Sequence, residues 1–142
     1  MAIQVYINFE GNCREAVEFY AEVFGADPPE IMTFGEAPLG PEYPVADEDK
    51  DLIMHTWLNI HDGLIMFSDV TKDMGRVMGN NVIITVVTDD IDALTSEFNA
   101  LSEDAHVEME LQETFWSKCY GYLVDKFGIP WQFVLDTGEM DM

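Results

Sequence analysis

Hydrophobic and polar positions change their spacing several times along this chain, and each change predicts an element of secondary structure. Residues 5–9 (VYINF) form a short β-type run that ends before Gly11. Asn12 and Glu15 then stand as an N-cap and its N3 partner, an Asn-headed capping box that predicts the start of a helix. Gly25 predicts the helix end, because apolar residues recur at helical spacing before it: Cys13, Ala16, Val17, Tyr20 and Val23.

Strand-like runs follow this helix, interrupted by one long polar segment. Residues 30–34 (EIMTF) predict a strand, whereas residues 35–51 carry three prolines and many charges and predict a long exposed loop. Residues 52–60 and 64–69 predict the two strands of a hairpin. Asp62-Gly63 suits the positive φ angles of a two-residue turn between these strands.

The same order of elements then restarts. Residues 82–88 predict a strand rich in β-branched residues, and Asp89 and Asp90 offer N-cap chemistry for the helix that follows. The apolar stripe of this helix lies 78 positions after that of the first, in the pairs Cys13 and Ile91, Ala16 and Leu94, Tyr20 and Phe98, Val23 and Leu101. Three further strands are predicted at 106–111, 119–125 and 131–135. This spacing indicates an internal duplication.

The duplication predicts an α+β fold within a single domain, residues 1–142. It consists of two βαβββ modules at about 1–70 and 82–137, joined by a linker at 71–81. Each module is expected to place one helix on one face of a mainly antiparallel sheet. If the two sheets curve side by side, their concave faces enclose a cleft with apolar walls and a few polar groups, a usual place for a ligand.

The chain resembles the vicinal oxygen chelate superfamily, which includes glyoxalase I, extradiol dioxygenases and bleomycin-resistance proteins. Within it, the chain is most similar to the PhnB-like branch, often given a 3-demethylubiquinone 3-methyltransferase domain name. Four segments carry the resemblance: 8–25, 53–60, 64–69 and 113–133. The resemblance implies a glyoxalase/bleomycin-resistance-like fold and a homodimer. Lys118-Cys119 departs from the branch, which usually has a pair containing arginine there, and Lys126 stands where proline is common.

The resemblance also implies where a metal would bind. Metal-dependent relatives hold one divalent ion with His, Glu or Gln side chains, one from the first and one from the last strand of each half. The matching positions fall near 5–8, near 66–68, near Ile83 and at Gln132, and only Gln132 is a credible, weak ligand. We therefore predict no bound metal and no cofactor. Methyltransferase activity is disfavoured as well, because no GxGxxG-like stretch follows a predicted strand.

Candidate ligand-binding residues lie on the strands that would line the cleft. His55 is mid-strand with Trp57 and Asn59 on its own face, and it is either a hydrogen-bonded structural residue or an acid–base group. The aromatic residues between 115 and 122 could pack a core, form a dimer contact or line the cleft. The predicted cleft residues are His55, Met66, Ser68, Phe115, Trp116, Tyr120, Tyr122 and Gln132.

The composition of the chain disfavours some classes of binding partner. The chain has 28 acidic and 6 basic residues and a formal net charge of −22, which repels nucleic acid and anionic membranes. Cys13 and Cys119 are too few for a disulfide scaffold. No apolar run approaches the length of a membrane span and the first residues lack a basic n-region, so a cytoplasmic location is expected.

Together these features predict a protein that binds or sequesters a small organic molecule without a bound metal. The alternative is a metal-dependent lyase, isomerase or dioxygenase with relocated ligands, using His55 and Gln132 with an acidic side chain brought close by folding. A third alternative is a structural or regulatory dimer whose cleft is filled by its own aromatic side chains.

Overall fold

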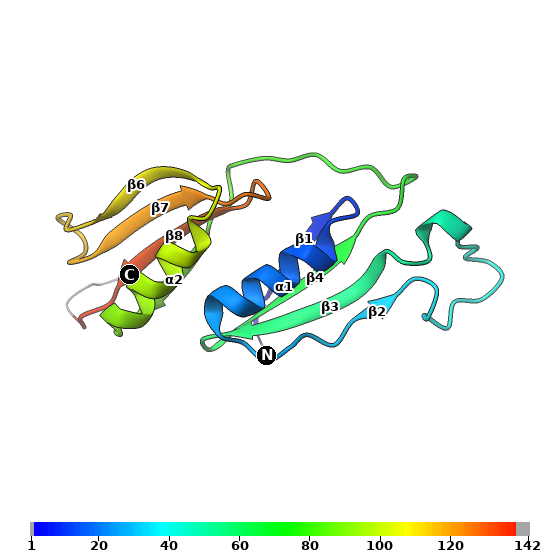
Figure 1. Cartoon of the computed structure of the whole chain (residues 1–142), viewed down its shortest axis with the longest axis horizontal. Helices are drawn as coiled ribbons and strands as arrows, with labels where there is room; N and C mark the ends of the chain where they lie inside the picture. The colour runs from blue at the N-terminus through cyan, green and yellow to red at the C-terminus, as the bar shows by residue number, and fades with distance from the viewer. Residues whose placement is uncertain (1, 139–142) are drawn as a thin grey trace. The chain divides into compact units, whose positions relative to one another are not determined.

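The computed structural model describes residues 2–138 of the chain. The chain divides into two compact units, and the boundary between them in the sequence lies between Val77 and Met78. We call these unit 1 and unit 2. Each contains the element order βαβββ, with one additional short 3₁₀ helix in unit 1 (Figure 1). The predicted α+β fold with two βαβββ modules is therefore confirmed.

Unit 1 contains one long helix and a four-stranded mixed sheet with strand order β1-β4-β3-β2. β1 runs parallel to β4, whereas β3 is antiparallel to both β4 and β2. α1 packs on β3 and β4 and so covers one face of this sheet (Figure 1). The elements are β1 (Val5–Phe9), α1 (Cys13–Phe24), β2 (Met32–Thr33), η1 (Asp47–Asp49), β3 (Ile53–Ile60) and β4 (Gly63–Asp69).

Unit 2 repeats this arrangement with strand order β5-β8-β7-β6. β5 is parallel to β8, β7 is antiparallel to both β8 and β6, and α2 packs on β8 and β5. The elements are β5 (Ile84–Thr88), α2 (Ile91–Leu101), β6 (His106–Gln112), β7 (Tyr120–Val124) and β8 (Pro130–Leu135). Among the described residues, no helix is long and apolar enough to cross a membrane.

Each core lies between a helix and the sheet that it covers. In unit 1 the buried Tyr20 ring on α1 stacks on Phe67 of β4 with 5.8 Å between ring centroids. In unit 2 Phe98 meets Phe133 edge to face at 5.5 Å. The first residue of the second stripe does not join this core, because Ile91 at the helix start is 44% exposed. The repeated stripes therefore fix the helix–sheet packing in both units, except at the first position of the second stripe.

The helix start in unit 1 differs from the sequence prediction. Asn12 is the N-cap residue of α1, but its side chain makes no cap hydrogen bond, and its buried Oδ1 lacks a partner among the described residues. The carboxylate of Asp69, at the end of β4, takes that role instead. Its Oδ1 accepts hydrogen bonds from the backbone N–H of Gly11 at 2.8 Å and of Cys13 at 3.0 Å. Its Oδ2 accepts a third, from the N–H of Ile53 at 3.0 Å.

Unit 2 uses two aspartates, one at the start of its helix and one at the turn between its last two strands. Asp90 caps α2, since its Oδ1 accepts from the N–H of Asp92 and of Ala93 at 3.1 and 3.0 Å. Asp125, 4% exposed, holds the turn between β7 and β8. Its Oδ1 accepts from the N–H of Phe127 and of Ile129 at 2.8 and 3.0 Å, and its Oδ2 accepts from the indole N–H of Trp131 at 2.9 Å.

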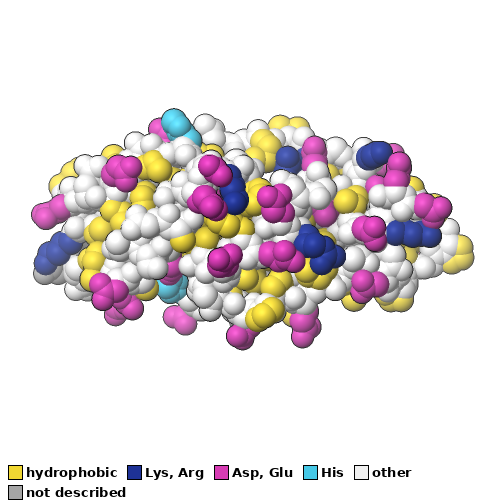
Figure 2. All heavy atoms as spheres, in the orientation of Figure 1, with side chains coloured by type: hydrophobic (Ala, Val, Ile, Leu, Met, Phe, Trp, Pro, Cys, Tyr) yellow, Lys and Arg dark blue, Asp and Glu magenta, His cyan; other side chains and the backbone are white. Residues whose placement is uncertain are grey.

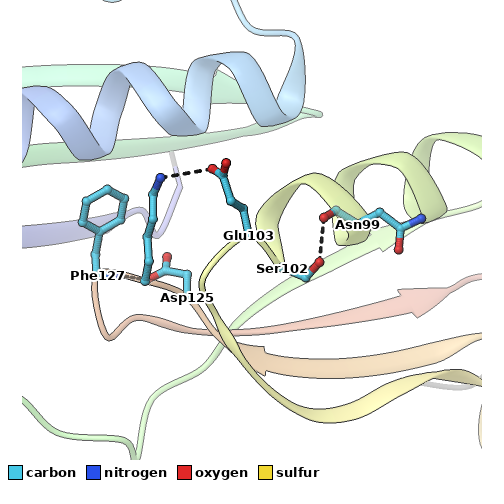
Figure 3. A network of polar contacts seen from close by, with 6 residues as sticks. Asn99, Ser102, Glu103, Asp125 and Phe127 are labelled. Carbon is cyan, nitrogen blue, oxygen red and sulfur yellow. Dashed lines mark hydrogen bonds and ion pairs between the residues drawn. The ribbon is translucent and has the colours of Figure 1, made fainter.

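The turn after β7 is also joined to the end of α2 by a surface ion pair. Figure 3 shows Glu103, which follows α2, facing the lysine between Asp125 and Phe127. This lysine is Lys126, and its ammonium lies 3.2 Å from Glu103 Oε2 and 5.6 Å from the centre of the Phe127 ring. Because the Glu103 side chain is 63% exposed, solvent screens this contact and it orients the turn more than it stabilises the fold.

Two local predictions about unit 1 are wrong. The hairpin turn is His61-Asp62, because Ile60 pairs with Gly63, and the residue with positive φ is His61 (φ 52). The strand predicted at 30–34 is only two residues long, since the pairing register with β3 shifts between Met32 and Thr33. An irregularity of this kind interrupts the ladder and ends regular pairing.

Candidate functional site

Each sheet has one face covered by a helix and one face that its own helix leaves uncovered. Successive strand residues point to opposite sides, and Ile65 and Phe67 face α1, so Met66 and Ser68 face away from it. Strand register extends this side across the sheet of unit 1. We call it the open face of unit 1, and it carries Tyr6, Asn8, His55, Trp57, Met66 and Ser68.

Three aromatic rings lie side by side on the open face of unit 1. The His55 ring is 5.9 Å from the Tyr6 ring and 5.7 Å from the Trp57 ring, measured between centroids. The Tyr6 hydroxyl lies 3.5 Å from His55 Nδ1. Tyr6 is 46% exposed, and His55 and Trp57 are half-buried. The rings therefore offer apolar surface to solvent together with the Tyr6 hydroxyl and the His55 ring nitrogens.

The open face of unit 2 carries a hydrogen-bonded chain of polar groups. It is built from Thr85 on β5, Gln132 on β8, and Tyr120 and Tyr122 on β7. The Tyr120 hydroxyl donates to Gln132 Oε1 at 2.5 Å, and Gln132 Nε2 donates to Thr85 Oγ1 at 2.7 Å. Both ends of the Gln132 amide are engaged, so its orientation is fixed. Burial raises the pKa of Tyr120, and the neighbouring Tyr122 adds to the rise, so this phenol remains a donor at neutral pH.

Phe115 and Trp116 lie outside the strands, in the segment between β6 and β7. Their rings meet edge to face at 4.7 Å, and Trp116 meets Tyr120 at 5.2 Å in the same manner. Phe115 is 97% exposed and Trp116 is 38% exposed. Trp116 therefore extends the aromatic surface beside Tyr120, whereas Phe115 projects into solvent.

The structure thus distributes the eight predicted residues over two surfaces and one loop. Unit 1 brings three of them, His55, Met66 and Ser68, onto one open face, and unit 2 brings Tyr120, Tyr122 and Gln132 onto another. A common cleft for all eight stays a prediction. Four residues of these faces are not in the predicted set: Tyr6, Asn8, Trp57 and Thr85. The alternation within residues 5–9 could have identified the first two.

The metal positions implied by the resemblance can now be tested against the donors present. The first and last strands of unit 1 place Asn8 opposite Ser68, and those of unit 2 place Thr85 opposite Gln132, two residues beyond the predicted Ile83. Within each pair the side chains bond to each other, since Ser68 Oγ donates to Asn8 Oδ1 at 2.9 Å and Gln132 donates to Thr85.

Neutral amides and hydroxyls are poor ligands for Zn²⁺, Ni²⁺ or Fe²⁺, which require imidazole, carboxylate or thiolate donors. The residues at these positions therefore do not fit the metal of the metal-dependent relatives. Within residues 2–138, no group of three or more His, Cys, Asp or Glu side chains is arranged to hold a metal ion.

The two cysteines are also unsuited to thiolate chemistry near neutral pH. Burial raises the pKa of Cys13 to about 12, and the Asp69 carboxylate adds to the rise. Burial likewise raises the pKa of Cys119. Both thiols therefore stay protonated, and the fully buried Cys13 acts as a core residue, as the helical stripe predicts.

Comparison with known proteins finds one matching family model and several similar proteins. The model of the Glyoxalase/Bleomycin resistance protein/Dioxygenase superfamily matches residues 4–133. Protein YjdN of Escherichia coli (strain K12) is 29% identical over 137 residues, which cover 92% of each chain. The structure of PA1353 from Pseudomonas aeruginosa is 32% identical, with a TM-score of 0.80 over 94% of this chain and 97% of that one. A PhnB protein from Bacillus cereus shares the fold at 23% identity, with a TM-score of 0.71 over 94% and 98% of the two chains.

Proposed function

The chain belongs to the glyoxalase/bleomycin resistance protein/dioxygenase superfamily, and from this premise we propose that it binds a small organic molecule on the open faces of its sheets. The proposal includes no resident metal. The observation that carries it is the character of these faces: that of unit 1 presents adjacent aromatic rings, and that of unit 2 presents an amide fixed by hydrogen bonds. Side chains that line ligand sites are usually apolar or aromatic, with a few oriented polar groups among them.

In unit 1 the aromatic surface supports binding of a flat or amphipathic molecule. Tyr6, His55 and Trp57 present adjacent rings on one side of the sheet. An aromatic ligand stacked there would bury apolar area, and the Tyr6 hydroxyl and the His55 ring nitrogens offer hydrogen bonds at its edge.

In unit 2 the polar chain supports a directional contact. The Gln132 amide is held from both sides by Tyr120 and Thr85, so its remaining lone pair and N–H are oriented before a ligand arrives. Groups that need no reorganisation lose less conformational entropy on binding, which favours affinity.

A thermal-shift screen of aromatic and amphipathic molecules tests the proposal. A ligand present at 100 times its Kd stabilises a protein by about 2.7 kcal/mol, which moves the unfolding temperature by several degrees. We expect His55→Ala or Gln132→Ala to abolish most of the shift caused by a hit. His106→Ala is the matched control, because His106 is an exposed histidine on β6 that pairs with Glu108.

Two results would contradict the proposal. One is a screen in which no class of organic molecule stabilises the protein. The other is a stoichiometric, tightly bound metal in the purified protein that is lost on His55→Ala or Gln132→Ala, which would support the metal-dependent lyase, isomerase or dioxygenase instead.

A further inference from the structure

Unit 1 contains a cavity that is separate from its open face. The cavity has a volume of about 710 Å³ and lies beneath the long loop between β2 and β3, which unit 2 lacks. Its apolar wall includes Leu39 and Tyr43 from the loop, Met54 from β3 and Met74 from the segment after β4. None of the residues that define the open face of unit 1 lines it. We call it the loop cavity.

The loop above this cavity is held in place by its own backbone. At its base the N–H of Phe34 donates to the carbonyl of Leu52, and the N–H of Gly35 donates to that of Lys50, both at 3.0 Å. A Cβ at Gly35 would lie 3.1 Å from Lys50 Cβ, so this close approach favours glycine. Further along, the N–H of Tyr43 donates to the carbonyl of Gly40 at 3.0 Å. These backbone hydrogen bonds therefore hold the loop over the cavity.

One carboxylate in the cavity has no partner. Asp49 lines the cavity and is 9% exposed. Its backbone is fixed on both sides, since its N–H donates to the carbonyl of Ala46 at 2.9 Å and its carbonyl accepts from Leu52 at 3.1 Å. Within residues 2–138 its side chain has no hydrogen-bond or ion-pair partner. A cation placed beside this carboxylate would form an ion pair that solvent screens less than one on the open surface.

The charges around Asp49 favour a ligand with a positive charge. Glu42 and Asp73 also line the cavity, and none of the described lining residues is basic. The nearby lysines are paired elsewhere, Lys50 with Asp47 at 2.6 Å and Lys72 with Glu48 at 3.2 Å. Acidic side chains are scattered over the surface shown in Figure 2, and the chain carries a net charge of −22. An anion would be repelled and an ammonium attracted.

We propose that the loop cavity binds an organic cation, an ammonium group with an apolar body. The ammonium pairs with Asp49, and the body packs against Leu39, Tyr43 and Met54. The volume accommodates a drug-sized molecule, and the Tyr43 ring adds a cation–π surface. This site does not depend on ligand binding at the open faces.

Three compounds with the same body and different charge test the proposal: 4-phenylbutylamine, 4-phenylbutan-1-ol and 4-phenylbutanoate. By isothermal titration we expect the amine to bind, the alcohol to bind at least tenfold more weakly and the carboxylate not to bind. Asp49→Asn should weaken the amine at least tenfold. Asp51→Asn, which removes the same charge from an exposed residue two positions away, should change its affinity less than threefold.

Two further measurements keep the proposal open to refutation. Tyr43→Ala should weaken the amine severalfold without unfolding the protein, because Tyr43 is 64% exposed. In the unaltered protein, amide NMR shifts on adding the amine should concentrate in residues 39–49. Equal affinity for amine and alcohol, equal effects of Asp49→Asn and Asp51→Asn, or shifts centred on His55 and Trp57 would each overturn it. The last result would leave the proposed function standing and remove only the loop cavity as a site.

Discussion

The two units have the same topology, but different aspartates bind the backbone N–H groups at their helix starts and turns. In unit 1 one buried carboxylate, Asp69, fixes the start of α1 and the start of β3 together. Unit 2 uses two carboxylates in other places, since Asp90 caps α2 and Asp125 holds the β7–β8 turn and the Trp131 indole. The shared apolar stripes determine the layers, whereas the satisfaction of buried N–H groups is solved locally in each copy.

The units also differ in what their connections carry. The segment between the second and third strands is short in unit 2, with β6 and β7 separated by residues 113–119. In unit 1 it spans residues 34–52 and roofs a cavity with an unpaired carboxylate. This agrees with the general observation that loops on a repeated scaffold vary most and acquire sites of their own.

The largest expected effect concerns the two buried aspartates. Asp69→Asn and Asp125→Asn each place an amide NH₂ against an N–H donor, Ile53 in unit 1 and the Trp131 indole in unit 2. We expect a loss of about 3 kcal/mol in the free energy of unfolding for each, measured by urea denaturation. Asp62→Asn, in the exposed hairpin turn, is the control. A loss below about 1 kcal/mol for either variant would show that the hydrogen bonds of its carboxylate do not hold the local structure in place.

A smaller loss of stability is expected from replacing a strand glycine by alanine, and it should differ between the two units. A Cβ at Gly121 of β7 would lie 2.6 Å from Phe98 Cε2, so Gly121→Ala forces the α2 core apart and should cost about 2 kcal/mol. At Gly63 of unit 1 the nearest atom to an added Cβ is Ile60 O at 3.5 Å, an ordinary contact. Gly63→Ala should therefore be close to neutral in thermal melts. Equal costs for the two variants would contradict the packing described for unit 2.

The two cysteines distinguish the units at alkaline pH. The folded pKa of Cys13 is about 12 and its ordinary value is 9.0, so its stabilising contribution is complete below pH 9 and is lost as the pH rises toward 12. By pH 10 the loss should be about 1 kcal/mol. Cys13→Ala should flatten the fall in stability above pH 9, and Cys119→Ala should flatten it less. An identical pH dependence in wild type and Cys13→Ala would exclude this linkage.

The smallest effect compares the two helix caps. Asp90→Ala removes a side chain that accepts two backbone N–H groups at the start of α2, and we expect a loss of about 1 kcal/mol. Asn12→Ala removes no cap bond in unit 1 and should change stability by less than about 0.5 kcal/mol. Chemical denaturation of both variants measures the difference. A costlier Asn12→Ala would mean that Asn12, and not Asp69, caps α1.

The element types and the duplication could be predicted because they depend on short-range periodicity. Helix and strand stripes repeat over a few residues, and every predicted strand and helix exists, although β2 is much shorter than predicted. The role of Asp69 could not be predicted, since its hydrogen bonds join residues 58 and 56 positions apart along the chain. The choice of His61 over Gly63 for the positive φ angle likewise depends on a pairing register that the sequence does not display.

The candidate site was predictable to a similar extent. Alternation along a strand placed His55 on one face with Trp57, and the resemblance placed Gln132 on the last strand. The matching position on the first strand of unit 2 was predicted near Ile83, two residues before Thr85, because the parallel register between β5 and β8 is set by tertiary packing. The loop cavity gave no signal beyond a proline-rich, charged segment, since the burial of Asp49 depends on how that segment folds back on β3.

The most direct test of the central claim is an amide NMR map of the protein with a saturating hit from the thermal-shift screen. If the open faces bind organic molecules, the largest shifts will fall at Tyr6, His55 and Trp57 of unit 1 or at Tyr120 and Gln132 of unit 2. Shifts confined to the exposed sides of α1 and α2, with these five residues unmoved, would contradict the account.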